Sequence, residues 1–564
     1  MALWGIEEKV KHYFADELEK EAEMTGAQFV VKFLEKKEVA HVFGIPGAAI
    51  LPFYDAVLEQ EHMRAINVHQ GQTAIFMAEG YARSTGKVGI CALTSGGGTT
   101  NFLTGLNSAH GDSIPLIVFT GQVTTNLIGK DAFQEAPIVE MARGITKAIY
   151  LVTKTEDLPK VTSEAWRLAT QGRKGPVLID IPVNVQKGLL KINLEDYLKE
   201  EKGEHIDLVK VSDSQLEEVF TMIEKAERPV LLVGGRVAGN VSDELIGLAQ
   251  LLQIPIVSSL MGKDGFPNYH HLYAGIAGPV CQTQLGNKTI YESDLIVNLG
   301  EWFDSRSTGG RNFFKEGSKI IHINITEEEI LFSHHIPDEL VIASDVKNFI
   351  LKLHNLIRSR EYKPNTEALK RIESLRIEKT NLARQAESES SPLKSQQMIT
   401  EVRKGIRPDA IVTLDWGLGR IWASQLYDAH EPRTFLIDRA GAMGWSLGAA
   451  MGAQLAYPQR QVVNLLGDAS LGMSLEGLAT AVKHDIPVVI VVFRKELEFA
   501  TAAKGMGVEA ELVEKPEQIT DALTRAFSAY RPYLIEILVD SDAQRSVSTR
   551  LFSLSTSTLS DRMI

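Results

Sequence analysis

The sequence contains few cysteines and no long apolar run. Of its 564 residues only Cys91 and Cys281 are cysteines, which excludes a disulfide framework and a cluster of thiolate metal ligands. No segment reaches the roughly 18 consecutive apolar residues that a membrane-spanning helix needs. The N-terminal stretch lacks the apolar run of a signal peptide and is too acidic for a transit peptide. We therefore expect a protein of the reducing cytoplasm that has no membrane partner.

Basic residues are the minority among the charged ones. The chain has 59 Lys and Arg against 72 Asp and Glu, which gives a net charge of −13. This excess of negative charge disfavours non-specific binding to nucleic acids and to anionic membranes. The composition, 44% hydrophobic and 23% charged, is that of an ordinary globular protein, and the length predicts several domains.

Three blocks of the sequence alternate short apolar runs with longer periodic stretches. This pattern predicts an α/β fold of three doubly wound domains, each a parallel sheet wrapped by helices. We place an N-terminal extension at 1–24, the three blocks at 25–190, 205–355 and 390–540, and a flexible tail rich in Ser and Thr at 541–564. The charged, loosely patterned stretches 194–213 and 359–395 are predicted to be linkers, the second with a helix.

Two capping boxes predict helix starts at the beginning of the first and second blocks. Thr25 is followed three residues later by Gln28, and Ser212 is followed in the same way by Gln215. In each case an apolar periodic stretch comes next, which is the expected pattern for an amphipathic helix.

A glycine-rich turn, Ser95 to Asn101, lies between a predicted strand and a predicted helix. Its free backbone N–H groups, with Gly96 and Gly97 at the centre, are suited to bind an oxyanion or a cofactor. The alternative is a tight turn that needs glycine only for its backbone conformation.

The stretch "NLLGDAS" places an acidic residue at the carboxyl end of an apolar strand. Open α/β sheets bind ligands at that edge, and Asp468 there is suited to hold a hard cation against a diphosphate. Its neighbours Gly467, Ala469 and Ser470 are candidate cofactor contacts. The alternative is again a simple turn.

In this order, the blocks resemble the thiamine-diphosphate enzymes of the acetohydroxyacid (acetolactate) synthase and glyoxylate carboligase group. The resemblance runs from about Thr25 to about Asp540. It is carried by stretches such as "VFGIPGAAILPFYDA", "MAEGYARSTGK", "LTSGGGTTNFLTGL", "GKDAFQEAPIVEMARGITK", "GAMGWSLGAAMGAQLA" and "GDASLGMSLEGLATAVKHDIPVVIVV". It implies a pyrimidine-binding domain, a central domain that in this group often holds FAD, and a diphosphate-binding domain. It also implies thiamine diphosphate and Mg²⁺ as cofactors, and a homodimer or homotetramer.

The resemblance assigns expected roles to several residues. Met443 matches the bulky residue that wedges under the cofactor, and Phe133 and Gln134 match residues that line the substrate side of the pocket. Arg306 matches an arginine that meets FAD in relatives, and Asp468 matches a metal ligand.

Gly71 departs from the family pattern. It stands where the family has the glutamate that hydrogen-bonds the aminopyrimidine, and Gln70 stands where a histidine is usual. We take Gly71 and Gln72 as the catalytic positions of this helix start. We expect the glycine to leave a gap that water can fill.

Two further departures affect the diphosphate end. The glycine after Asp468 is replaced by Ala469, and the expected pair of asparagines after "IPVVIVVF" is Arg494 and Lys495. An ammonium group cannot ligate Mg²⁺, so Lys495 points away, or no ion binds, or the basic pair neutralises the diphosphate directly. The loop and helix that close over the diphosphate in the family are missing after Lys495.

The leading prediction of function is a carboligase that acts on small 2-keto acids and forms acetolactate from pyruvate. Val183, in place of a lysine frequent in that group, and the missing glutamate also leave open a glyoxylate carboligase that forms tartronate semialdehyde. The third alternative is a catalytically silent relative that keeps the fold.

Overall fold

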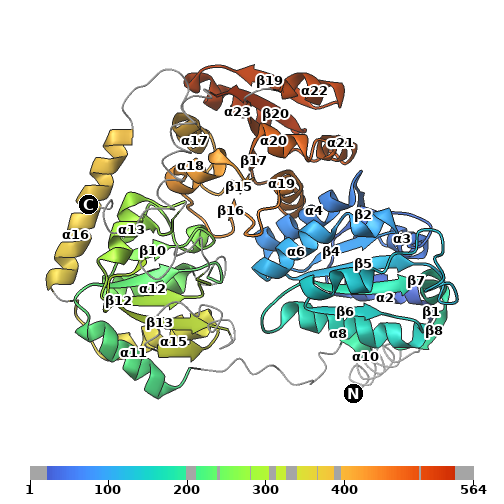
Figure 1. The fold of residues 1–564 in the computed structure, drawn as a ribbon, viewed down its shortest axis with the longest axis horizontal. Coiled ribbons are helices and arrows are strands. Elements are labelled where there is room, and N and C mark those ends of the chain that lie inside the picture. Colours follow the sequence, from blue (N-terminus) through green and yellow to red (C-terminus); the bar gives the residue numbers. More distant parts are fainter. Residues whose placement is uncertain are drawn as a thin grey trace, which may run out of the picture. The chain divides into compact units, whose positions relative to one another are not determined.

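The structure is a computed structural model that describes residues 22–198, 211–237, 242–279, 281–303, 313–325, 340–364, 366–386, 395–494 and 497–539. The chain divides into two compact units, an N-terminal unit of residues 1–82 and 86–206 and a C-terminal unit of 83–85 and 207–564. One six-stranded parallel sheet lies in the N-terminal unit and two lie in the C-terminal unit (Figure 1). The predicted α/β fold is therefore confirmed. The expected tail, Arg306 and Lys495 lie outside the described residues.

The sheet of the N-terminal unit is built from wholly buried central strands. Its order is β3 (Arg64–Asn67), β2 (His41–Ile45), β4 (Gly89–Leu93), β5 (Leu116–Gln122), β7 (Val177–Pro182) and β6 (Ala148–Leu151). Because helices cover both faces, β4, β5 and β7 read as nearly continuous apolar runs rather than as alternating ones.

The helices of this unit precede, connect and follow its parallel strands. They are α2 (Gly26–Lys36), α3 (Leu51–Leu58), α4 (Gly71–Thr85), α5 (Gly97–Thr100), α6 (Leu103–Asp112), α7 (Ile138–Ala142), α8 (Leu158–Thr170), α9 (Val183–Lys187) and α10 (Glu195–Leu198). The predicted capping box of Thr25 and Gln28 is present at the start of α2. Just before it, β1 (Ala22–Thr25) pairs antiparallel with β8 (Leu189–Ile192).

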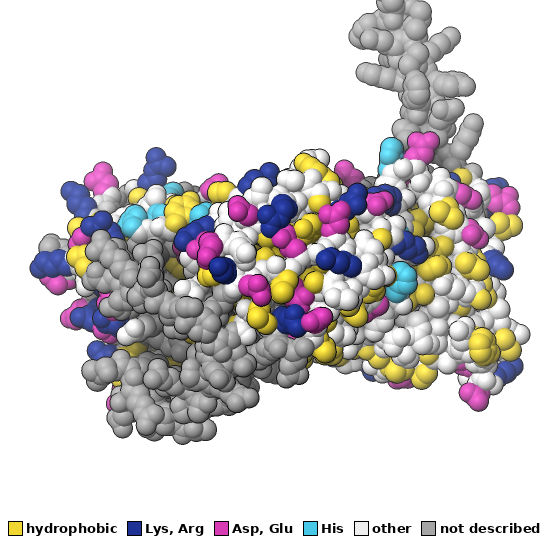
Figure 2. All heavy atoms as spheres, turned by 90° about the horizontal axis from the view of Figure 1, so that it is seen from above, with side chains coloured by type: hydrophobic (Ala, Val, Ile, Leu, Met, Phe, Trp, Pro, Cys, Tyr) yellow, Lys and Arg dark blue, Asp and Glu magenta, His cyan; other side chains and the backbone are white. Residues whose placement is uncertain are grey.

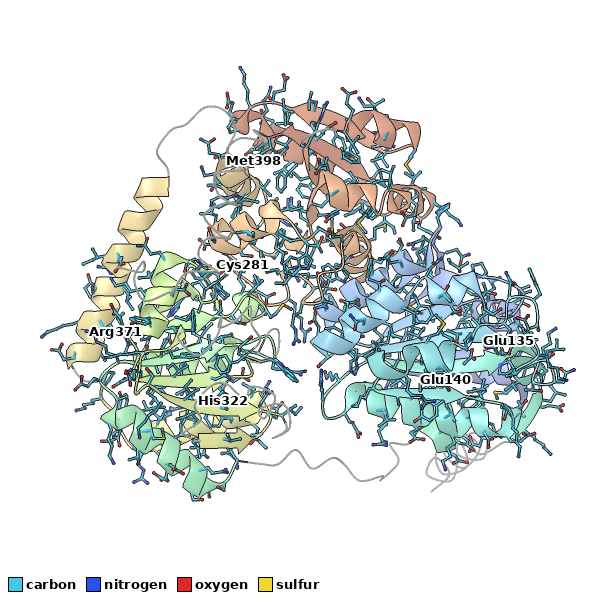
Figure 3. The ribbon with its side chains drawn as sticks, viewed as in Figure 1. Glu135, Glu140, Cys281, His322, Arg371 and Met398 are labelled. Atoms are coloured by element: carbon cyan, nitrogen blue, oxygen red, sulfur yellow. The ribbon has the colours of Figure 1, made fainter. Side chains whose placement is uncertain are left out.

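The central sheet belongs to the C-terminal unit. Its order is β11 (Tyr273–Ile276), β10 (Ile256–Ser258), β9 (Pro229–Val233), β12 (Leu295–Leu299), β13 (Lys319–Asn324) and β14 (Leu340–Ala343). Its helices are α11 (Asp213–Lys225), which has the predicted Ser212 capping box, α12 (Ser242–Leu252), α13 (Gln284–Tyr291), α15 (Val346–Ser359) and α16 (Thr366–Ala386). Arg371 anchors α16 by donating to the carbonyl oxygens of Pro229 and Thr289 at 3.2 and 3.0 Å, and burial lowers its pKa to about 10 (Figure 3).

The C-terminal sheet has the order β16 (Phe435–Leu436), β15 (Ile411–Leu414), β17 (Val462–Gly467), β18 (Val489–Arg494), β20 (Tyr533–Leu538) and β19 (Glu509–Val513). Its helices are α17 (Ser395–Lys404), α18 (Leu418–Leu426), α19 (Trp445–Ala456), α20 (Asp468–Gly472), α21 (Glu476–Lys483), α22 (Phe499–Gly505) and α23 (Ile519–Ser528).

A joining segment, residues 259–270, fastens the central sheet to the C-terminal sheet by buried hydrogen bonds. The Asp264 carboxylate accepts from the backbone N–H groups of Thr434 and Phe435, both at 3.1 Å. Asn268 and Ala429 exchange two hydrogen bonds, at 2.9 and 3.0 Å. Burial raises the pKa of Asp264 to about 6, although the N–H groups of Thr434 and Phe435 act to lower it. The joining segment therefore connects the central sheet and the C-terminal sheet through buried hydrogen bonds as well as through the chain.

The surface carries both signs of charge. On one face, Lys and Arg side chains are interspersed with Asp and Glu side chains (Figure 2). In the described part of the chain, no helix combines the length and the apolar character that crossing a membrane requires.

Candidate active site

The candidate site residues of the N-terminal unit lie at the carboxyl edge of its sheet. The segments that follow β3, β2, β4 and β5 leave the sheet there, and these four strands are neighbours. The segments are 68–70, 46–50, 94–102 and 123–136. Ligands of open α/β sheets bind at this edge, so the topology alone brings the predicted residues to one place.

The glycine-rich turn after β4 has room for a ligand. Gly96 has a positive φ of 68°, and its carbonyl accepts from the Thr99 hydroxyl at 2.8 Å. A Cβ added to Gly97 would meet no atom within 4 Å, so the space beside this residue is open. The Thr94 hydroxyl is buried at the start of the turn and has no hydrogen-bond partner within the described chain. These features fit a bound polar group.

Gly71 is tightly packed, and the expectation of a water-filled gap is wrong. A Cβ at this position would lie 2.9 Å from the Gly98 carbonyl oxygen, 3.2 Å from Leu93 Cδ2 and 3.4 Å from Asn101 Cβ. The glycine turn lies against the helix start, so protein atoms already occupy the place of a side chain. Gln72, in the first turn of α4, accepts a hydrogen bond from the Gln70 side chain at 3.3 Å.

Gln134 lies directly beside the glycine turn. A Cβ on Gly96 would lie 3.1 Å from Gln134 Cβ, and Gln134 itself has a positive φ of 61°. Phe133 projects outward with 88% of its surface exposed. Glu135 closes the tip of this loop by accepting from the N–H groups of Gly129 and Ala132, which hold its pKa below the usual value (Figure 3).

In the C-terminal unit, the other candidate residues gather at the carboxyl end of β17. Asp468 begins α20 directly after Gly467, and no atom lies within 4 Å of a Cβ added to that glycine. The Asp468 carboxylate accepts from the N–H of Ala469 at 3.0 Å, and Ala469 is exposed. Ser470 is buried and donates to the Trp416 carbonyl at 3.3 Å.

Met443 lies on a loop that two buried carboxylates hold in place. Gly441 and Gly444 flank it with φ of 81° and 82°, values that favour glycine. Asp438 accepts from the Gly441 N–H at 2.7 Å, and Asp415 accepts from the Gly444 N–H at 3.2 Å. A partly exposed methionine on so firmly held a backbone is suited to support a ligand.

The sequence analysis missed Asp415, Asp438 and Arg420. Arg420 is almost fully buried, pairs with Asp438 at 3.4 Å and lies 3.9 Å from the centroid of the Trp416 ring. Asp415 directly follows the apolar run "AIVTL", and Asp438 ends the run "TFLID". Both have the same strand-end signal as Asp468, and that signal could have identified them.

The described residues supply one candidate ligand for a metal ion. Among them, no group of three or more His, Cys, Asp or Glu side chains could hold an ion. Arg494, at the end of β18, forms ion pairs with Glu536 at 3.3 Å and Glu498 at 3.2 Å, so its charge is already committed. Mg²⁺ is often bound through one or two carboxylates plus the phosphates of a ligand, and Asp468 can fill the first of these roles.

The connection after β18 is short. The strand ends at Arg494 and α22 begins at Phe499. The N–H groups of Phe499 and Ala500 donate to the buried Glu536 carboxylate at 3.3 and 2.8 Å. Residues 495–498 are too few to form a loop and a helix over a ligand.

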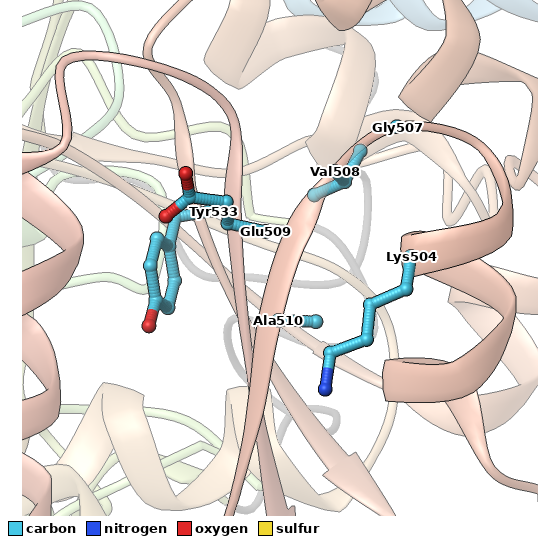
Figure 4. Close-up of a pocket in the computed structure, with 6 residues that line it drawn as sticks. All are labelled: Lys504, Gly507, Val508, Glu509, Ala510 and Tyr533. Atoms are coloured by element: carbon cyan, nitrogen blue, oxygen red, sulfur yellow. The ribbon is translucent and has the colours of Figure 1, made fainter.

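A surface hollow of about 340 Å³ lies elsewhere in the C-terminal unit (Figure 4). It is lined by Lys504, Gly507, Val508, Glu509, Ala510 and Tyr533. Glu509 and Tyr533 are the first residues of β19 and β20, so the hollow lies at the amino ends of these strands. It is therefore at the opposite edge from Asp468.

Comparisons with known proteins agree with this architecture. Three thiamine pyrophosphate enzyme profiles match the chain: the N-terminal TPP binding domain at residues 24–141, the central domain at 216–353 and the C-terminal TPP binding domain at 415–497. A 4-hydroxybenzoylformate decarboxylase from Rhodococcus jostii RHA1, thiamine diphosphate-dependent, has a similar fold. It has a TM-score of 0.79 at 23% identity, covering 92% of this chain and 99% of that one.

Sequence relatives are similar over nearly the full length. The probable acetolactate synthase large subunit of Methanocaldococcus jannaschii is 33% identical, with 92% of each chain covered. The acetolactate synthase of Mycobacterium leprae is 34% identical over 93% of this chain and 88% of that one. The isozyme 1 large subunit of Escherichia coli is 36% identical over 84% of this chain and 82% of that one. The chain belongs to the thiamine-diphosphate-dependent enzymes, in the group that contains the acetolactate synthase large subunits.

Proposed function

We propose that this protein is a carboligase that decarboxylates one molecule of pyruvate and joins the remaining two-carbon unit to a second pyruvate, giving 2-acetolactate and carbon dioxide. The Met443 loop carries this proposal, because two buried carboxylates hold it at the carboxyl edge of the sheet that also presents Asp468. The similarity to several acetolactate synthases supports the choice of substrate.

Each residue of the site then has a defined task. Thiamine diphosphate, when bound, would supply a nucleophilic carbon and an electron sink for the decarboxylation. Met443 would support the cofactor from the C-terminal unit, and the open backbone beside Gly97 in the N-terminal unit of a second copy would contact it. Asp468 would hold Mg²⁺ against the diphosphate. Phe133 and Gln134 would orient the substrate and reduce its contact with water.

The helix start at Gly71 sets this chain apart from an ordinary carboligase. Glycine brings no carboxyl group to the cofactor, so proton transfer within the aminopyrimidine is expected to proceed without the usual acid. We therefore expect slow turnover, since a well-placed general acid or base contributes about 10²- to 10⁴-fold.

Calorimetric titration of thiamine diphosphate into the purified chain, with and without Mg²⁺, tests the proposal. Binding that requires Mg²⁺, followed by release of carbon dioxide and formation of acetolactate from pyruvate, supports it. Product from glyoxylate alone would favour tartronate semialdehyde synthesis instead. The absence of binding under both conditions would favour the catalytically silent relative.

We propose further that the working form contains at least two copies of the chain. Phe133 in the N-terminal unit and Met473 in the C-terminal unit, near their respective candidate sites, are 88% and 57% exposed, and contact with a second copy would bury this apolar surface. Light scattering of the purified protein would show the oligomeric state. Flavin binding by the central domain stays a prediction, because Arg306 lies outside the described residues, and the visible absorbance of the purified protein would test it.

A further inference from the structure

The loop that carries Phe133 and Gln134 is held at both ends by one side chain. This loop, residues 123–136, leaves the carboxyl end of β5, whose last residue is Gln122. The Gln122 side-chain oxygen accepts from the Val123 N–H at 2.9 Å, and its side-chain nitrogen donates to the Ala136 carbonyl at 3.1 Å. Gln122 is 5% exposed, its bond to Ala136 is buried and its bond to Val123 is partly buried. We name this arrangement the loop clamp.

A buried carboxyl group fixes the orientation of the Gln122 amide. The side-chain nitrogen also donates to Asp180 Oδ2 at 3.0 Å, while the Thr120 hydroxyl donates to Asp180 Oδ1 at 2.7 Å. Thr120 and Asp180 lie side by side in the paired strands β5 and β7. Because Asp180 accepts from the nitrogen, the amide oxygen is left to face Val123. Asp180, on the neighbouring strand β7, therefore determines the orientation of the Gln122 amide group.

The clamp places the loop against the glycine turn. Gln134 lies so close to Gly96 that a Cβ there would be 3.1 Å from Gln134 Cβ. Within the loop, Glu135 ties the Gly129 and Ala132 N–H groups together, and the Asn184 side chain accepts from the Thr125 N–H at 2.9 Å. These bonds, exposed or partly buried, shape the loop, whereas the buried Gln122 joins both loop ends to the sheet.

We propose that Gln122 is a positioning residue, which sets Phe133 and Gln134 at the glycine turn and thereby determines how firmly the site holds its 2-keto acid. This inference rests on the proposed function for its kinetic part. Its structural part concerns the loop itself and needs neither substrate nor cofactor.

Amide hydrogen exchange of the full chain without cofactor tests the structural part. The Gln122→Leu variant keeps similar bulk and loses both clamp bonds, so exchange in residues 124–136 should become about 3- to 10-fold faster. Gln186→Leu is the matched control. Gln186 is equally buried and donates to the carbonyl oxygens of Ala49 and Ile181, which lie outside the loop. Unchanged loop exchange in Gln122→Leu, or equal acceleration in the control, would overturn the proposal.

The double variant Gln122→Glu with Asp180→Asn provides a second test if the leucine variant does not fold. Replacing Asp180 by its amide removes the neighbouring carboxyl group, with which a glutamate would otherwise share a proton. The ionised glutamate still accepts from the Val123 N–H but cannot donate to the Ala136 carbonyl. Exchange should then increase near residue 136 more than near residue 124. Equal acceleration at both ends, or none, would contradict the role assigned to the clamp.

Steady-state kinetics test the functional part. In Gln122→Leu, KM for pyruvate should rise about 10-fold while kcat changes less than 3-fold, because the loop holds the substrate and does not perform the chemistry. A fall in kcat with unchanged KM would refute this. If the unmodified protein shows no turnover, the proposed function fails, and the exchange experiment still decides the clamp.

Discussion

Gly71 offers a test in which a single added methyl group opposes a backbone carbonyl. In Gly71→Ala, the new Cβ would lie 2.9 Å from the Gly98 carbonyl oxygen, closer than carbon and oxygen normally approach. The glycine turn would have to shift by a few tenths of an ångström. Overpacking of this kind costs about 1–3 kcal/mol, while replacing glycine within a helix returns about 0.5–1 kcal/mol. We therefore expect a net loss of about 1 kcal/mol in the free energy of unfolding.

Urea unfolding of the two alanine variants Gly71→Ala and Gly97→Ala measures this difference. Both glycines begin a helix at the same edge of the sheet, but no atom lies within 4 Å of a Cβ added to Gly97. Gly97→Ala should therefore leave stability nearly unchanged and weaken cofactor binding instead. A Gly71→Ala variant as stable as the parent would refute the packing argument.

Gly71→Glu adds the missing acid at the same position. Its stability loss should exceed that of Gly71→Ala because the longer side chain must pass the same carbonyl. Where the variant still binds thiamine diphosphate, the thiazolium C2 proton should exchange with solvent modestly faster than in the parent. NMR measures this exchange rate. An unchanged rate in a variant that binds the cofactor would show that this chain does not depend on an acid there.

Three further predictions concern buried or site residues. Burial raises the pKa of Asp180 from 3.8 to about 7, so the folded chain holds this proton more tightly, and stability falls as the pH rises from about 4 to about 7. Asp180→Asn should remove this loss of stability, which amounts to at most about 4 kcal/mol. Parallel stability–pH curves for parent and variant would refute this role of Asp180. Asp468→Ala should weaken the Mg²⁺-dependent affinity for thiamine diphosphate at least about tenfold by calorimetry, and unaltered Mg²⁺ dependence would remove Asp468 from the metal site. Met443→Ala should lower kcat about 10- to 100-fold while changing cofactor affinity less, and the reverse pattern would show a binding role only.

The sequence pattern predicted the architecture well because that part depends on local signals. Apolar runs, helix periodicity and the capping boxes at Thr25 and Ser212 determine where strands and helices form, and the structure confirms them. The position of Asp468 at the end of β17 follows from the same local rule. The order of parallel strands then brings the site segments to common edges.

The environment of individual site residues depended on contacts between distant parts of the chain. Nothing near Gly71 in the sequence indicates that the Gly98 carbonyl would fill its side-chain position. For Asp415 and Asp438 the strand-end signal marks the positions but not the roles, because a carboxylate after a strand looks the same whether it holds a neighbouring loop or faces solvent. Long-range packing decides between these outcomes, and a single sequence carries no direct record of it.

The joining segment also affects how the C-terminal unit unfolds. Its residues extend from β10 and β11 of the central sheet, yet Asp264 and Asn268 supply hydrogen bonds that the C-terminal sheet needs in its interior. Separating the two sheets would break these hydrogen bonds and expose the apolar contacts of Leu260 and Met261 with the core of the C-terminal sheet, which is costly. The two sheets should therefore melt as one cooperative block, and a chain cleaved between α16 and α17 should stay associated. A protein in which one of these sheets is exchanged for another would need new partners for Asp264 and Asn268.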